Sequence, residues 1–176
     1  MGVLLLVNGG FMLLSSLISL FSNDGFVEKI TISSLIVISA GFVFLFFGRG
    51  YEKQIQKREG YLIVTLGWIL MSITGTIPYI MTGVIPQFSS SFFESMSGYT
   101  TTGATIIEKI DSLPKGILFW RSTTHWIGGM GIIVLAIAIL PFLGIGGTQL
   151  FSAEAPGPAS DKLHPRITDT AKRLWL

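Results

Sequence analysis

The chain of 176 residues has no cysteine and few charged side chains. Without cysteine it can form no disulfide, no thiolate metal site and no cysteine-based catalytic intermediate. Charged residues make up 12% of the sequence, about half the share typical of soluble domains. The formal net charge of +2 is too small to indicate a nucleic-acid partner. With 49% hydrophobic residues, this shortage of charge indicates an integral membrane protein.

We expect no cleavable signal peptide at the start of the sequence. No basic residue precedes the first apolar run and no A-x-A cleavage site follows it, so we expect that run to remain as a membrane span. About 20 apolar residues cross the ~30 Å hydrocarbon core of a bilayer. Runs of about this length occupy residues 3–21, 30–47, 61–81 and 117–140, and we expect the third helix to loosen near Pro78.

Basic residues give the topology. Arg49, Lys53, Lys57 and Arg58 lie in or beside the loop of residues 49–60, which the positive-inside rule places in the cytoplasm. The predicted division is therefore two leading spans in residues 1–48, a cytoplasmic loop, a membrane repeat in residues 61–140, and a cytoplasmic tail in residues 141–176. The tail ends in what we expect to be the start of a further helix of a longer protein.

A short segment lies between the third and fourth runs. Residues 91–97 read as a helix of seven residues, which is about 10 Å long at 1.5 Å per residue. Ser91 and Glu94 have the spacing of a capping box, and Gly98 is suited to end a helix. Such a helix can enter the membrane halfway from the outside and stop there.

The next residues, Thr100 to Ala104, are rich in hydroxyl groups and contain Gly103. In cation channels, backbone carbonyls replace the hydration shell of the ion. Glycine permits the backbone angles that this requires, and the C-terminal end of a short helix adds a partial negative charge. These letters alone also fit an ordinary Thr/Gly loop, but their place between two spans favours an ion filter.

Four motifs resemble one family. FFESMSGYTTTGAT, LPKGILFWRS, HWIGGMGIIVLAIAILP and AEAPGP…DKLHPRITDTAKRLW are similar to the first pore repeat of the Trk/Ktr/HKT superfamily of potassium transporters, of the bacterial TrkH type. The resemblance is close from about residue 50 to 176 and looser before. It implies an all-α membrane fold, in which two leading transmembrane helices precede helix–pore loop–helix repeats of a potassium-channel-like fold, four of them around one pore.

The resemblance also assigns residues and partners. It implies that Gly103 is the filter glycine and that Thr101 and Thr102 bind the ion, with Thr100 and Ala104 flanking them. It implies uptake of K⁺, without a cofactor, by a multi-pass protein of the inner membrane. The partners that it implies are the lipid membrane, three further repeats, a second copy of the protein and a cytosolic nucleotide-binding regulatory subunit. The chain departs from the family by ending after one repeat.

Other residues in the fourth run have simpler readings. Gly128, Gly129 and Gly131 follow no strand and lack the full phosphate-loop spacing, so we expect close helix packing. A packing or interfacial role is expected for His125. Arg121 is expected to extend to the membrane surface, with pairing to Glu94 as the less favoured alternative.

Other classes of function stay open beside the transporter. The chain could be a non-conducting membrane scaffold or fragment, or a single-repeat subunit of a tetrameric cation channel. An intramembrane serine protease is disfavoured, because the sequence has no G-x-S-x-G motif and Ser95 and Ser97 have no evident histidine partner. We therefore expect a protein that is not an enzyme.

Overall fold

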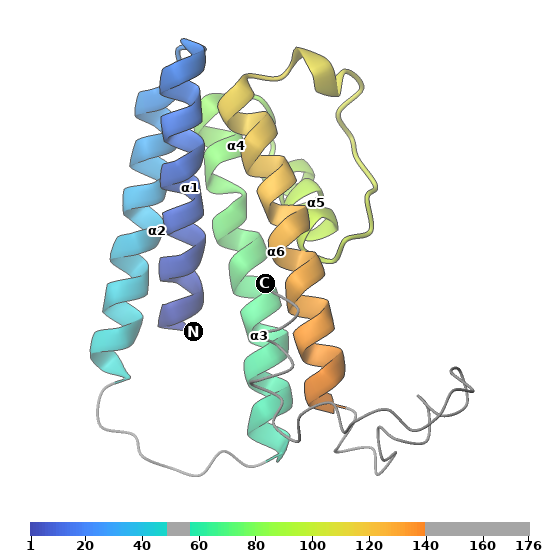
Figure 1. The fold of residues 1–176 in the computed structure, drawn as a ribbon. Coiled ribbons are helices and arrows are strands. Elements are labelled where there is room, and N and C mark those ends of the chain that lie inside the picture. The colour runs from blue at the N-terminus through green and yellow to red at the C-terminus, as the bar shows by residue number, and fades with distance from the viewer. Residues whose placement is uncertain (49–56, 140–176) are drawn as a thin grey trace, which may run out of the picture. The chain divides into compact units, whose positions relative to one another are not determined.

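The computed structural model describes residues 1–48 and 57–139, with the side chains of residues 1–48 and 62–131 (Figure 1). The elements are α1 (Gly2–Ser22), α2 (Val27–Phe47), α3 (Lys57–Gly75), α4 (Ile77–Thr82), α5 (Phe88–Tyr99), the 3-10 turn η1 (Ile110–Ser112) and α6 (Lys115–Ile139). Every element in these ranges is helical, which confirms the all-α prediction. Residues 1–128 form one compact unit. The predicted cytoplasmic tail and residues 49–56 of the predicted loop lie outside the described ranges.

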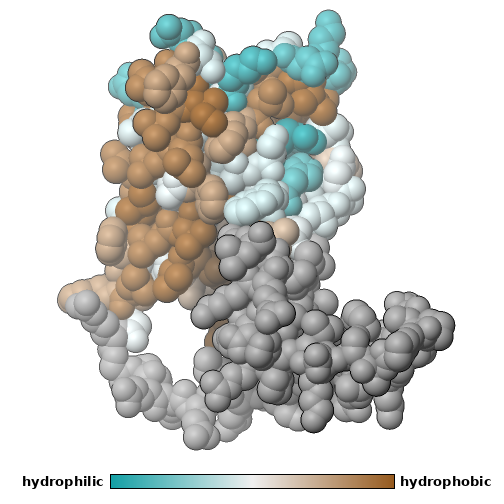
Figure 2. All heavy atoms as spheres, viewed as in Figure 1, coloured by the Kyte–Doolittle hydropathy of each residue, from teal (hydrophilic) through white to brown (hydrophobic). Residues whose placement is uncertain are grey.

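Three stretches of helix within the described residues are long and apolar enough to cross a membrane: Gly2–Ser22, Val27–Phe47 and Leu62–Thr82. They correspond to the first three predicted runs, and the fourth run forms most of α6. Large apolar side chains of α1 and α2 are exposed, among them Phe21 at 85% and Phe47 at 80%. Figure 2 shows this apolar surface over the α1–α2 side, with hydrophilic atoms at the end where the two helices join. Exposed apolar side chains along two whole helices suit contact with lipid.

The third span is broken where proline predicted it. α3 ends at Gly75, and α4 begins at Ile77 with Pro78 in its first turn. Proline fits the first turn of a helix because its missing N–H has no partner to lose there. The carbonyl of Gly75 at the break accepts a hydrogen bond from Nε1 of Trp120 on α6 at 3.2 Å, and Trp120 is fully buried. The carbonyl left free at the break thus links α3 to α6.

The turn between α1 and α2 holds the start of α6. Oδ2 of Asp24 accepts the backbone N–H of Gly116 at 2.9 Å, while Oδ1 accepts the hydroxyl of Ser19 and the N–H of Phe26. Burial raises the pKa of the Asp24 carboxyl, but these three hydrogen bonds outweigh it and leave the pKa below its ordinary value. A carboxylate at a helix N-terminus also stabilises the helix, because it interacts favourably with the helix dipole. The leading hairpin therefore anchors the first turn of α6.

Candidate ion-filter site

The short helix before the Thr/Gly segment is α5, and it is longer than predicted. It runs from Phe88 to Tyr99, twelve residues instead of seven, or about 18 Å at 1.5 Å per residue. It remains too short to cross a membrane, which needs about 20 residues. The prediction of a half-membrane helix in this position therefore agrees with the element, although both of its ends differ.

The predicted capping box of Ser91 and Glu94 is wrong. Gln87 precedes the helix and no side chain caps it. Ser91 lies in the first turn, where its buried hydroxyl donates to the carbonyl of Ile85 at 2.6 Å. Glu94 lies in the middle of α5, and its carboxylate binds partners on other segments. Partners that the fold brings close have replaced the local pairing that the spacing suggested.

The prediction that Gly98 ends the helix is also wrong, because α5 continues to Tyr99. A Cβ atom at Gly98 would overlap the Thr124 hydroxyl on α6. One at Gly128 would overlap the backbone carbonyl of Tyr99. Both glycines let α6 approach the end of α5 closely, which confirms the packing role expected at Gly128.

After Tyr99 the chain enters the filter segment, residues 100–104. The N–H groups of Thr100, Thr101 and Thr102 bond back to carbonyls of the last turn of α5, at 2.9, 3.0 and 3.0 Å. Thr101 has φ of 55° and Gly103 has φ of 77°, both in the left-handed region. Such angles are costly for a non-glycine residue, so Thr101 is a strained position. The segment is exposed along its whole length.

The backbone carbonyls of the filter segment fall into two groups. The carbonyl of Thr100 accepts the hydroxyl of Thr101 at 2.7 Å, and that of Ala104 accepts the hydroxyl of Ser97 at 2.6 Å. Among the residues that the structure describes, none donates a hydrogen bond to the carbonyls of Thr101, Thr102 or Gly103. These three carbonyls belong to exposed residues and are therefore candidates for binding an external partner.

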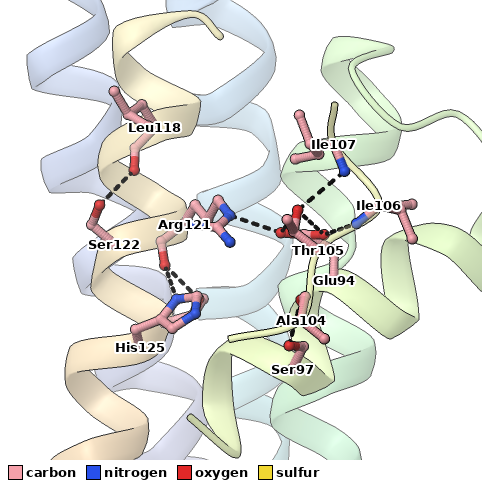
Figure 3. Close-up of polar contacts among 11 residues, drawn as sticks. Glu94, Ser97, Ala104, Thr105, Ile106, Ile107, Leu118, Arg121, Ser122 and His125 are labelled. Carbon is pink, nitrogen blue, oxygen red and sulfur yellow. Dashed lines mark hydrogen bonds and ion pairs between the residues drawn. The ribbon is translucent and has the colours of Figure 1, made fainter. Parts of the chain in front are cut away.

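A carboxylate holds the chain just after the filter segment (Figure 3). Glu94 accepts the hydroxyl of Thr105 at 3.0 and 2.9 Å, the N–H of Ile106 at 3.1 Å, and Nε of Arg121 at 2.7 Å. The side chain of Glu94 is fully buried and that of Arg121 is 14% exposed. The expectation that Arg121 extends to the surface is wrong, because a buried carboxylate within reach needs a counter-charge.

A neutral chain of hydrogen bonds holds the residue just before the filter segment. The hydroxyl of Tyr99 donates to Oδ1 of Asn8 on α1 at 2.5 Å, and Nδ2 of Asn8 donates to the hydroxyl of Thr74 on α3 at 3.1 Å. Asn8 and Tyr99 are fully buried. Our reading of the sequence missed both residues, although a polar side chain inside an apolar span is costly and is itself a signal.

His125 and the acidic side chains that the structure describes do not gather into a metal site. Nδ1 of His125 lies 3.0 Å from the carbonyl of Arg121 on its own helix, which fits the packing role expected for it. Within the described part of the chain, no three histidine or acidic side chains gather as metal ligands would.

A sequence profile of the TrkH family, described as a cation transport protein, matches residues 26–176. The chain belongs to the TrkH family. The TrkH potassium uptake protein of Salmonella typhimurium is 45% identical over 177 residues, which cover 99% of this chain and 37% of the relative. The TrkG protein of Escherichia coli K12 is 46% identical over 125 residues, covering 70% of this chain and 26% of the relative.

The crystal structure of the potassium transporter TrkH from Vibrio parahaemolyticus superimposes with a TM-score of 0.81 at 39% identity. The match covers 99% of this chain and 34% of that one. The likeness confirms both the resemblance and the predicted membrane fold. As a TrkH-family chain with helices of membrane-spanning length, the protein is a multi-pass protein of the inner membrane. It spans about a third of the length of the TrkH relatives. These relatives are named as potassium uptake proteins.

Proposed function

We propose that the full-length protein takes up K⁺ across the membrane and that this chain supplies one of four filter strands. The ion binds the carbonyls of Thr101, Thr102 and Gly103, while Thr100 and Ala104 flank the site. Residues 1–48 form a leading hairpin in this proposal, residues 61–140 one pore repeat, and residues 49–60 and 141–176 the cytoplasmic connections. The potassium uptake named for the relatives supports the choice of ion.

The observation that carries the proposal is that three exposed residues, Thr101, Thr102 and Gly103, have carbonyls that accept no hydrogen bond from the described part of the chain. Potassium channels replace the hydration shell of the ion with carbonyls of this kind. The carbonyls on either side are already used within the chain, at Thr100 and Ala104. This pattern supports the same three residues that the resemblance assigned to the ion.

Glu94 does not act as a charged ion ligand in this mechanism. Its carboxylate is buried, paired with Arg121 and bonded to Thr105 and Ile106. Its charge is therefore balanced before any cation arrives. The ion meets carbonyl dipoles and the C-terminal end of α5, whose partial charge is negative.

One strand cannot surround an ion, so the site needs partners. We propose that three further repeats complete the filter, since this chain covers 37% of a TrkH relative. A second copy of the protein and a cytosolic nucleotide-binding regulatory subunit complete the proposed assembly, in which K⁺ is the cargo and no cofactor is needed. A non-conducting scaffold and a tetramer of single repeats are the alternatives that the test must separate.

The test is Gly103→Ser in the full-length protein, expressed in cells that lack their own potassium uptake. A side chain at positive φ costs about 1–2 kcal/mol and shifts the carbonyls. We expect the preference for K⁺ over Na⁺ to fall about tenfold or more, which corresponds to about 1.4 kcal/mol. Gly83→Ser is the matched control, because Gly83 has φ of 80° and a Cβ atom there, as at Gly103, meets nothing within 4 Å.

Three results would contradict the proposal. Equal selectivity in Gly103→Ser and the parent would remove Gly103 from the filter. Absence of ion flux through the parent protein would favour a scaffold. Uptake by the 176-residue chain expressed alone would favour a tetramer of single repeats.

A further inference from the structure

Asn8 lies in the second turn of α1, the first apolar helix. It is fully buried, and both ends of its amide are used. Oδ1 accepts from Tyr99 on α5, and Nδ2 donates to Thr74 on α3. A buried amide in a membrane helix is costly unless it is satisfied in this way. Its contacts join three helices that are far apart in sequence.

The hydrogen bonds form a chain with one direction. The Tyr99 hydroxyl donates to Asn8, Asn8 donates to Thr74, and the Thr74 hydroxyl donates to the carbonyl of Leu70 at 3.0 Å. Each donor thus has an acceptor, and the chain ends on the backbone of α3. Hydrogen bonds arranged in series polarise one another and are stronger in a low-dielectric interior.

Tyr99 is the last residue of α5, directly before the filter segment. A Cβ atom at Gly75 of α3 would lie 3.0 Å from Cε2 of its ring, and one at Gly128 of α6 would overlap its backbone carbonyl. Asn8 holds the hydroxyl at the far end of the same side chain. Three helices therefore fix one residue at its ring, its backbone and its hydroxyl.

We propose that Asn8 is a positioning residue of the filter, acting through Tyr99. The inference rests on the proposed function, since it concerns the same three carbonyls. Thr101 lies two residues beyond Tyr99, and a binding site must hold its ligands within about 0.5 Å. A shift of the Tyr99 ring moves the backbone that carries the first ligand. The leading helix α1 is thus part of the filter scaffold.

The experiment is a double-mutant cycle in the full-length transporter. Tyr99→Phe removes one oxygen atom, and Asn8→Leu replaces the amide with an apolar group of similar size. Each single change leaves a buried partner unsatisfied, whereas the double change removes both groups. We expect each single variant to raise the KM for K⁺ and to lower the preference over Na⁺, each about tenfold, or about 1.4 kcal/mol. Vmax per transporter in the membrane stays within about twofold, or about 0.4 kcal/mol.

We expect the double variant to be no worse than the worse single variant, because residues in one network are not additive. Ser34→Ala is the matched control. Ser34 is also fully buried, and it donates from α2 to the carbonyl of Gly9, the residue after Asn8 on α1, at 2.8 Å. Its loss should leave KM and selectivity as in the parent.

Three results would overturn the inference. The first is a change in protein abundance alone, with KM and selectivity unchanged in Tyr99→Phe. The second is an equal change in Ser34→Ala. The third is a double variant whose effect equals the sum of the single effects. If Asn8→Leu fails to reach the membrane, Tyr99→Phe alone decides between the outcomes. Gly103→Ser distinguishes the failure of this inference from the failure of the proposed function. If Gly103→Ser alters the selectivity and Tyr99→Phe does not, this inference is wrong and the proposed function stands.

Discussion

The chain is held on the two sides of the filter segment by different chemistry. Before it lies the neutral limb, Tyr99 with Asn8 and Thr74, in which no group carries a charge. After it lies the charged limb, Thr105 and Ile106 on the carboxylate of Glu94, which Arg121 neutralises. The fully buried groups of the neutral limb, Tyr99 and Asn8, are uncharged, while Arg121 keeps 14% of its side chain exposed. The fully buried carboxylate of Glu94 is paired with the Arg121 guanidinium, because a buried charge is costly unless a counter-charge and hydrogen bonds compensate it.

This difference shows how the exposed filter segment can keep a fixed backbone conformation. Ser97 joins the two limbs by donating to the carbonyl of Ala104 at 2.6 Å. The carbonyls of Thr101, Thr102 and Gly103 take no part in either limb or in this link. The limbs fix the ends of the segment and leave the middle free for a ligand.

The largest effect is expected from Glu94→Gln in the charged limb. The amide has nearly the shape of the carboxylate, but it leaves Arg121 without a counter-charge. Breaking one partner of a buried pair costs about 3–5 kcal/mol. We expect less full-length protein in the membrane, a lower thermal midpoint and loss of K⁺ uptake. Glu108→Gln is the control, because Glu108 is exposed on the segment between α5 and η1.

A double substitution that removes both partners of the ion pair sharpens this test. Replacing both partners, in Glu94→Gln with Arg121→Gln, removes the unpaired charge and should restore part of the stability. If Glu94→Gln is as stable and as active as the parent, the charged limb does not hold the segment.

A smaller effect is expected from Gly128→Ala on the neutral limb. The added methyl group would overlap the carbonyl of Tyr99 and push the end of α5 away from α6. Overpacking of this kind costs about 1–3 kcal/mol. We expect a lower thermal midpoint and a higher KM for K⁺ in the full-length protein. Gly10→Ala is the control, since nothing lies within 4 Å of a Cβ atom there. Equal behaviour of the two variants would show that the neutral limb tolerates displacement.

The sequence predicted what depends on local composition. The membrane spans follow from runs of apolar residues, and the break in the third span follows from Pro78, whose ring fits a first turn. The Thr/Gly segment was found from its place between two spans. Its left-handed angle at Gly103 is the one for which glycine was expected.

The predictions that failed concern side chains whose partners lie far away in the sequence. Ser91 and Glu94 have the spacing of a capping box, yet Ile85 and Arg121 compete successfully for their oxygens. The bond between Tyr99 and Asn8 joins positions 91 apart in sequence. Spacing along one helix cannot reveal such a pair, because the packing of three helices brings the two side chains together. A polar residue in an apolar span shows only that some partner must exist.

The smallest effect concerns Asp24, which anchors the start of the helix that carries Arg121. Its pKa in the folded protein lies below the ordinary 3.8. A lowered folded-state pKa means that its contribution to stability is present above the unfolded-state pKa and is lost as pH falls through the folded-state value. Asp24→Asn should therefore lower the thermal midpoint slightly at neutral pH, since a carboxylate at a helix N-terminus contributes about 0.3–1 kcal/mol. In strong acid the two proteins should converge, because the parent carboxyl is then neutral as well. Asp111→Asn, on the exposed η1 turn, is the control. A difference between Asp24→Asn and the parent that stays constant from neutral to acidic pH would mean that the charge of Asp24 does not stabilise α6.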